Sequence, residues 1–203
     1  NKGAKMGFDI TGLNPKNIEI NEPERPDNLF ELSQKEQDKY FEKRELYLNQ
    51  SGTYFRNNVW WWRPLANYVL EYTKVIPEEN QEGWHYNDCY EVSKQDAEMI
   101  GQQLVHLIKS GHTKKFEKQY EQRRKKIEKH NEKVEKELET FSQSVKKKLN
   151  DIGLAPKDFP EEDHKKWEEI YKKRNSDGSY PFSEENVKEF SEFCKNSGGF
   201  SIG

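Results

Sequence analysis

The chain has 203 residues, of which 32% are hydrophobic and 35% charged, and its formal net charge is −3. This length fits one domain, or one domain with an extension, and the small apolar fraction predicts a modest core beside solvated helices. Aromatic residues reach 13%, which together with the low net charge argues against a disordered chain. Because no apolar run approaches about 18 residues, we expect no membrane contact.

The cellular compartment is predicted from the cysteines and the N-terminus. Cys89 and Cys194 are too few for a disulfide framework or a cysteine zinc site. The first residues lack the apolar core of a signal peptide, and Met6 is a candidate for the natural first residue after an added segment 1–5. We therefore expect a reducing, cytoplasmic location.

The N-terminal part is predicted to be extended and then helical. Glycines and prolines in residues 1–27 predict an extended segment, either coil or a short edge strand around residues 8–13. Ser33 and Glu36 have the spacing of a capping box, which predicts a helix over residues 34–49. Its weak apolar face consists of Tyr40, Phe41, Leu46 and Leu48.

Residues 53–62 allow two interpretations. Asn57–Asn58 fits a tight turn between two short strands, because asparagine tolerates positive φ. The same stretch also fits direct entry into a helix. Pro64 suits a first helical turn, and the apolar spacing after it predicts a helix buried on more than one side.

A long charged helix is predicted over about residues 113–151. It follows a helix that Ser93 caps and Gly111 ends. Its apolar residues recur at three-, four- and seven-residue steps and form a narrow stripe, like an imperfect coiled-coil seam. Either the C-terminal helices or a second copy would cover this stripe, and a homodimer through the long helix is the favoured partner arrangement.

Two short helices and a glycine-rich tail are predicted at the C-terminus, the tail over residues 197–203. The expected fold is therefore mainly α, with a compact helical part, a short β-hairpin, a long charged coiled-coil-like helix and a C-terminal helical pair. The predicted divisions are an extended segment over 1–27, a Trp-rich helical core over 28–111, the long helix over 112–152 and C-terminal helices packing back over 153–203.

The strongest functional signal is a run of three tryptophans between two arginines. Stacking on the rings, with arginine forks for phosphates, would grip a nucleotide-like ligand, whereas a structural interpretation places the rings in the core. Adjacent side chains cannot all point the same way, so at least one ring should reach a surface. The candidate contact residues here are Arg56, Asn58, Trp60, Trp61, Trp62 and Arg63.

A second polar and aromatic cluster contains Trp84, His85, Asn87 and Asp88. His85 and Asp88 fit a base and its orienter, although the same residues fit an ordinary turn and cap. No zinc-type array, calcium loop, glycine-rich phosphate loop or nucleophile elbow occurs, so we assign no catalytic residue, metal ligand or cofactor. The lysines of the long helix alternate with glutamates, which favours a solvated face over a nucleic-acid surface.

Three stretches resemble small proteins of bacteriophages and environmental viral sequences, a group with no assigned activity. These stretches are MGFDITGLNP, GTYFRNNVWWWRPL and FSEENVKEFSEFCKNSGGF, about a fifth of the chain. The resemblance implies a viral accessory protein that acts in a bacterial cytoplasm. It implies no activity, cofactor or site residue.

The sequence therefore favours a non-enzymatic binding protein that grips a host protein or sequesters a nucleotide-like ligand through the tryptophan block. A counter-defence role would follow from the viral resemblance. Two alternatives remain open: a small hydrolase acting on a nucleotide-like substrate, and a structural viral protein that assembles through the long helix.

Overall fold

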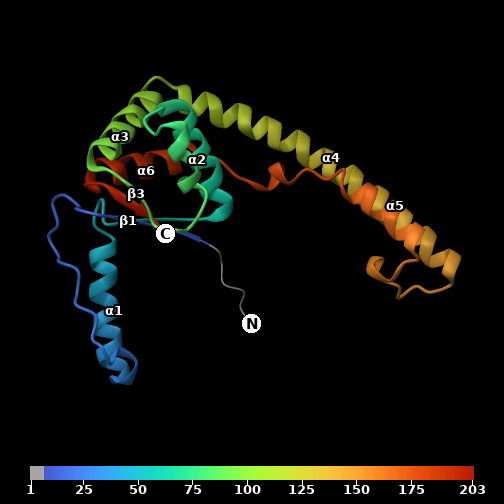
Figure 1. Ribbon diagram of the computed structural model, residues 1–203, viewed down its shortest axis with the longest axis horizontal. Coiled ribbons are helices and arrows are strands. Elements are labelled where there is room, and N and C mark those ends of the chain that lie inside the picture. Colours follow the sequence, from blue (N-terminus) through green and yellow to red (C-terminus); the bar gives the residue numbers. More distant parts are fainter. Residues whose placement is uncertain (1–6) are drawn as a thin grey trace. The chain divides into compact units, whose positions relative to one another are not determined.

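The computed structural model describes residues 7–203, and it is mainly helical with one small antiparallel sheet (Figure 1). The expectations for residues 1–6, including Met6 as the first residue, lie outside the described part. Two compact units are present. The first contains the described residues up to Glu117 together with Phe182–Gly203, and the second contains Lys118–Pro181.

The sheet of the first unit has the strand order β2-β1-β4-β3, and every neighbouring pair is antiparallel. Its strands are β1 (Gly7–Gly12), β2 (Tyr54–Asn58), β3 (Tyr90–Val92) and β4 (Phe200–Ile202). Ile10 of β1 pairs with Phe55 on one side and with Ile202 on the other. The segment predicted as an edge strand is thus a central strand, because the C-terminal residues supply a neighbour that the sequence pattern did not reveal.

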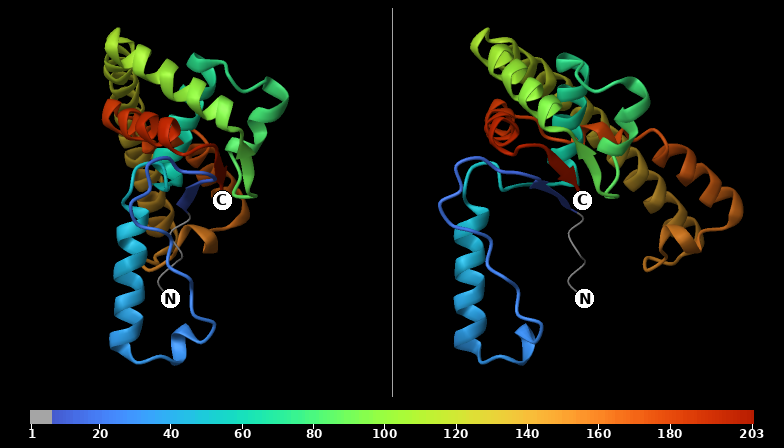
Figure 2. Two further views of the ribbon diagram at one scale, coloured as in Figure 1. Left: turned by 90° about the vertical axis from the view of Figure 1, so that its left-hand side faces the viewer. Right: turned by 60° about the vertical axis from the view of Figure 1, so that its left-hand side comes forward.

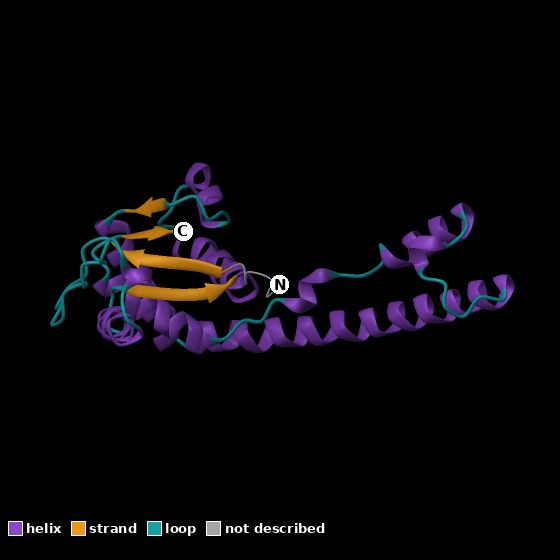
Figure 3. Cartoon of the chain, turned by 90° about the horizontal axis from the view of Figure 1, so that it is seen from below, coloured by secondary structure: helices purple, strands orange, loops and turns teal. Residues whose placement is uncertain are grey.

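Three helices cover one face of this sheet (Figures 1 and 3). They are α2 (Val59–Thr73), α3 (Lys94–Lys109) and α6 (Glu184–Asn196). Inward side chains of the strands, such as Ile10 and Phe200, join the apolar faces of these helices in one hydrophobic core. Burial of this kind is the main favourable contribution to folding, so the first unit owes its stability to this layer.

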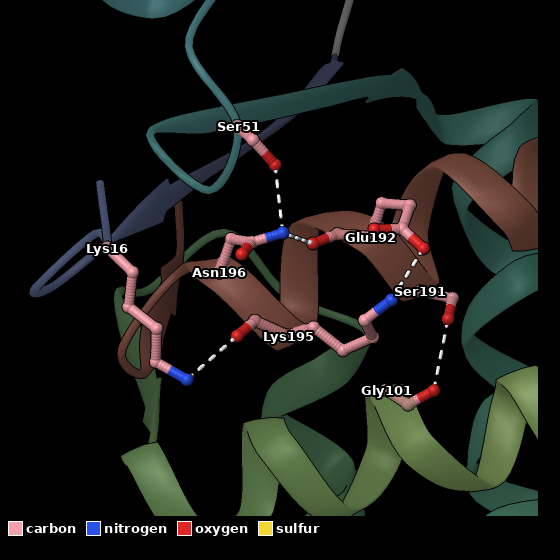
Figure 4. Close-up of polar contacts among 7 residues, drawn as sticks. All are labelled: Lys16, Ser51, Gly101, Ser191, Glu192, Lys195 and Asn196. Atoms are coloured by element: carbon pink, nitrogen blue, oxygen red, sulfur yellow. Dashed lines mark hydrogen bonds and ion pairs between the residues drawn. The ribbon is translucent and has the colours of Figure 1, made fainter. Parts of the chain in front are cut away.

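The contact between α3 and α6 is close enough to require a glycine. A Cβ atom at Gly101 would lie 2.7 Å from Cγ of Lys195 and 3.1 Å from the carbonyl oxygen of Ser191. The Ser191 hydroxyl donates to the carbonyl of Gly101 at 3.0 Å, and Asn196 Nδ2 donates to the Ser51 hydroxyl at 2.9 Å (Figure 4). These contacts hold α6 between α3 and the segment that leads into β2.

The predicted glycine-rich tail is a buried strand. Gly198 and Gly199 have φ values of +64° and +97°, and together they turn the chain from α6 into β4. A Cβ atom at Gly198 would lie 1.9 Å from the carbonyl oxygen of Asn14, so a larger residue does not fit. The composition of residues 197–203 indicated a tail, whereas the glycines form a tight turn into the centre of the sheet.

Within the first unit an arm projects from the sheet between β1 and β2, and we define it as residues 13–50. It contains the short 3₁₀ helix η1 (Leu29–Glu31) and the helix α1 (Gln34–Leu48), which begins with the predicted capping box of Ser33 and Glu36. α1 extends away from the sheet on the side opposite to α3 and α6 (Figure 2). Gln50 fixes the base of the arm, since its Oε1 accepts from the backbone amides of Glu19 and Ile20 at 2.7 and 2.9 Å.

The second unit is formed by the long helix α4 (His112–Leu149) beyond Glu117 and by α5 (Glu161–Tyr171). α5 runs antiparallel to α4, because Lys148 pairs with Asp163 at 3.2 Å and Lys173 pairs with Glu137 at 2.6 Å. Three residues of the predicted stripe are buried here, namely Val134, Leu138 and Val145.

The chain therefore covers part of its own stripe, and the apolar seam no longer requires a second copy. The homodimer stays a prediction, and the apolar stripe of α4 no longer supports it. The predicted C-terminal helical pair does not form one body: α5 lies in the second unit, whereas α6 lies in the core of the first.

Candidate binding surfaces

The tryptophan block begins a helix directly after a strand, so both interpretations of residues 53–62 are partly correct. No tight turn forms at Asn57–Asn58, because β2 continues through Asn58. The Asn58 side chain then caps α2 by accepting from the backbone amides of Trp60 and Trp61 at 3.1 and 3.2 Å. Pro64 lies inside α2 and not in its first turn, because the helix starts five residues earlier, at Val59.

Trp62 and Trp84 are core residues with 0% of their surface exposed. Trp62 stacks between Phe8 and Trp84, at ring-centroid distances of 5.4 and 5.8 Å. Its indole nitrogen donates to the carbonyl of Trp84 at 2.7 Å, which satisfies the one polar atom of the ring. The prediction that these two rings contact a ligand is corrected, since neither offers any accessible surface.

The other two tryptophans of the run lie nearer to solvent. Trp60 is 46% exposed and Trp61 is half-buried. The helical turn after the Asn58 cap explains this division, because successive residues on a helix point about 100° apart and only Trp62 faces the sheet. Trp60 is therefore the ring of the block that a partner would reach most easily.

Arg56 lies on the sheet face that the helices leave open. Its Nε is 3.3 Å from a carboxylate oxygen of Asp9, its partner in the register of β1 and β2. The Tyr54 hydroxyl donates to the same carboxylate. Burial, this hydrogen bond and the Asp9 charge together raise the pKa of Tyr54 to about 12. Arg56 thus belongs to a surface network of Asp9, Tyr54 and Arg56.

The second predicted cluster is brought together only in part. Burial, and then the positive charge of Arg63, lower the pKa of His85, so these two predicted residues lie near each other. Among the residues that the structure describes, His85 makes no hydrogen bond to the exposed Asp88. Asn87 is structural, because its Nδ2 donates to the carbonyl of Gly7 at 2.8 Å. The predicted base and orienter are therefore not joined.

His85 borders a cleft of about 700 Å³ between α2 and the 3₁₀ helix η2 (Glu78–Trp84). Its lining residues are Asn67, Leu70, Glu71, Lys74, Ile76, Pro77, Glu78, Gln81 and His85. Two of these are glutamates, which would repel phosphate groups. Neither Arg56 nor Arg63 lines this cleft, so the predicted arginine forks do not converge on it.

A cavity on the arm was not predicted from the sequence. It has a volume of about 590 Å³, and its lining residues are Glu22, Pro23, Glu24, Arg25, Leu29, Phe30, Tyr40, Phe41 and Arg44. Phe30 is 75% exposed and Phe41 is 45% exposed, although both carry large apolar rings. Arg25 lies over the Phe30 ring, 5.7 Å from its centroid. Exposed aromatic rings beside arginines are typical of protein-binding surfaces.

The arm helix α1 exposes apolar side chains to solvent. None of the fifteen residues of α1 is buried, and Leu46 is exposed together with Phe41. The weak apolar face of residues 34–49 was the available signal. The predicted helical core of residues 28–111 included this helix, because a sequence does not show which apolar faces find a partner within the chain.

The described residues contain no group of three or more His, Cys, Asp or Glu side chains that could hold a metal ion. Within residues 7–203, no helix has the length and apolar character needed to cross a membrane. Comparisons with protein family models, curated proteins and solved structures found no match for this chain.

Proposed function

We propose that this chain is a non-enzymatic protein-binding protein and that the arm is its contact surface. The observation that carries the proposal is the helix α1, which buries none of its residues while it exposes Phe41 and Leu46. Short helices gain most of their stability in proteins from packing of an apolar face. A partner surface would supply the packing that the rest of the chain does not give to α1.

The chemistry of the arm indicates what kind of partner fits. Phe30, Tyr40 and Phe41 supply aromatic surface, and Arg25 and Arg44 supply fork-shaped donors beside it. Such residues dominate the binding free energy in protein interfaces, where they fill apolar pockets and pair with carboxylates. Glu22 and Glu24 line the same cavity, so its charges balance, and we propose a partner protein with an apolar groove and a rim of mixed charge.

The role of the tryptophan block is a separate part of this proposal. Trp60 would be a second contact on α2, outside the arm, with Arg63 one turn further along this helix. Sequestration of a nucleotide-like ligand at this block has weaker support, since Trp62 is buried and the neighbouring cleft contains glutamates.

A viral counter-defence role rests on the sequence resemblance alone. A hydrolase is not proposed, because His85 and Asp88 are not joined.

The experiment is partner capture followed by reconstitution. The full chain is immobilised and incubated with bacterial lysate, and each captured protein is identified, purified and titrated against the chain by calorimetry. We expect the double variant Phe30→Ser with Phe41→Ser to bind the purified partner at least about tenfold more weakly, because two exposed aromatic anchors are lost.

Met99→Ser is the matched control, because Met99 is an exposed apolar residue of α3 outside the arm. This control should bind like the unmodified chain. Trp60→Ala tests the tryptophan block separately. The arm is excluded as the contact surface if the double variant binds normally, or if only Trp60→Ala loses binding. Failure to reconstitute any partner from purified protein would contradict the proposed function as a whole.

A further inference from the structure

A basic cavity lies within the second compact unit. Its volume is about 590 Å³, and it is an open hollow that a small ligand reaches directly from solvent. The lining residues are Arg123, Lys126, Ile127, His130, Lys173, Arg174, Asn175 and Ser176. Four of them are cations, and no carboxylate is among them.

Hydrogen bonds hold the two walls of the cavity together. One wall is a face of α4, where Arg123, Lys126 and His130 follow one another at three- and four-residue steps. The other wall is the chain after α5. His130 Nε2 donates to the carbonyl of Lys173 at 2.8 Å. Asn131 donates to the carbonyl of Asn175 at 2.8 Å and accepts from its backbone amide at 2.9 Å. These hydrogen bonds therefore fix the position of the cations on α4 relative to those on the chain after α5.

Acids outside the lining compensate three of the four cations of the cavity. Arg123, Lys173 and Arg174 pair with Asp177, Glu137 and Glu135, and none of these acids lines the cavity. Within residues 7–203, Lys126 has no ion-pair partner. Lys126 is therefore the cation whose charge a bound anion would compensate most directly. The chain as a whole carries a net charge of −3, which makes a local group of cations without lining acids distinctive.

We propose that this cavity binds a small anion with several phosphate groups. Arginine forks match two oxygens of a phosphate at once, and a lysine adds a point charge. Ile127 is the only apolar side chain of the lining, and no aromatic ring is present there to stack on a base. The site therefore recognises the phosphate groups and not the organic group attached to them. This proposal does not depend on the arm or on a protein partner.

The test is isothermal titration of the full chain with inorganic pyrophosphate at constant ionic strength. We expect saturable binding, and we expect Lys126→Glu to weaken it at least about tenfold, because a central attraction becomes a repulsion. Lys133→Glu is the matched control, since it makes the same charge change at an exposed residue of α4 outside the cavity. Its affinity should stay within about twofold of the unmodified chain.

Three results would overturn the proposal. The first is an absence of saturable binding at about millimolar pyrophosphate, which corresponds to the weakest class of specific sites. The second is an equal loss of affinity in Lys133→Glu, which would indicate unspecific attraction to the charged helix. The third is much tighter binding of adenosine triphosphate than of inorganic tripolyphosphate, which would mean that the base is recognised. Lys126→Ala is measured in parallel, and helicity by circular dichroism verifies that each variant is folded.

Discussion

Three consecutive tryptophans have three different environments in this chain. Trp62 is enclosed between Phe8 and Trp84, Trp61 is half-buried, and Trp60 is the most exposed. The sequence alone predicted that the rings could not share one face, because that follows from backbone geometry. It did not identify the buried ring, since the answer depends on where β2 ends and α2 begins.

The stability of variants tests this division. Trp62→Ala should lower the free energy of unfolding by about 3–5 kcal/mol, because it leaves a large cavity and removes a buried hydrogen bond. Trp60→Ala should lower it by less than about 1 kcal/mol, as expected for a substitution near the surface. Urea unfolding followed by circular dichroism measures both. Equal losses in the two variants would contradict the assigned environments.

The hydroxyl of Tyr54 provides a pH-dependent test at the same scale. Its pKa in the folded chain is raised to about 12 from the ordinary value of 10, so folding favours the neutral phenol. This contribution to stability is fully present below pH 10 and is lost as the pH rises to about 12. The ring-carbon chemical shift of Tyr54 should therefore titrate later than that of an unperturbed tyrosine. Titration near pH 10 would contradict the network of Tyr54 and Asp9.

Caps were the most predictable features of the individual elements. Ser33 with Glu36, and Ser93 with Asp96, begin α1 and α3 as predicted, because these contacts involve residues only three positions apart. The C-terminal strand was not predictable in the same way. β4 is stabilised by pairing with β1 and β3, more than a hundred residues away, and only its glycines gave a local signal.

The turn into β4 makes a specific prediction for Gly198. Gly198→Ala should destabilise the chain by more than about 2 kcal/mol, because it combines an unfavourable positive φ with a contact against Asn14. Gly111→Ala is the control, since Gly111 has a φ of +76° but a Cβ atom added there would meet no other atom within 4 Å. The control should lose about 1 kcal/mol from backbone strain alone. Similar losses in both variants, measured by thermal unfolding, would show that the close approach to Asn14 is absent.

At the scale of the whole molecule, the proposed functions are divided between the two compact units. The arm of the first unit offers apolar and aromatic surface, whereas the second unit offers a cavity lined by cations. From the sequence, either a host protein or a nucleotide-like ligand was expected at the tryptophan block. That expectation arose because arginine and aromatic residues are adjacent there in the sequence, whereas both cavities are formed by segments that are separated along the chain.

This division predicts that the two activities can be lost separately. The double variant Phe30→Ser with Phe41→Ser should bind pyrophosphate with unchanged affinity, and Lys126→Glu should bind the protein partner with unchanged affinity. Calorimetry of both variants with both ligands measures this. Loss of both activities in either variant would indicate a shared site and would contradict the separate proposals.

The most direct test of the protein-binding proposal is hydrogen–deuterium exchange of the full chain without a partner. Exchange reports local opening, which is easy where few buried apolar contacts hold a helix. The amides of α1 should therefore exchange far faster than those of residues 100–104 in α3 and 190–194 in α6, which contribute buried side chains to the core. If the amides of α1 are protected from exchange as strongly as those of the core helices, α1 is already stable without a partner. That result would contradict the proposal that the arm is a surface for a partner protein.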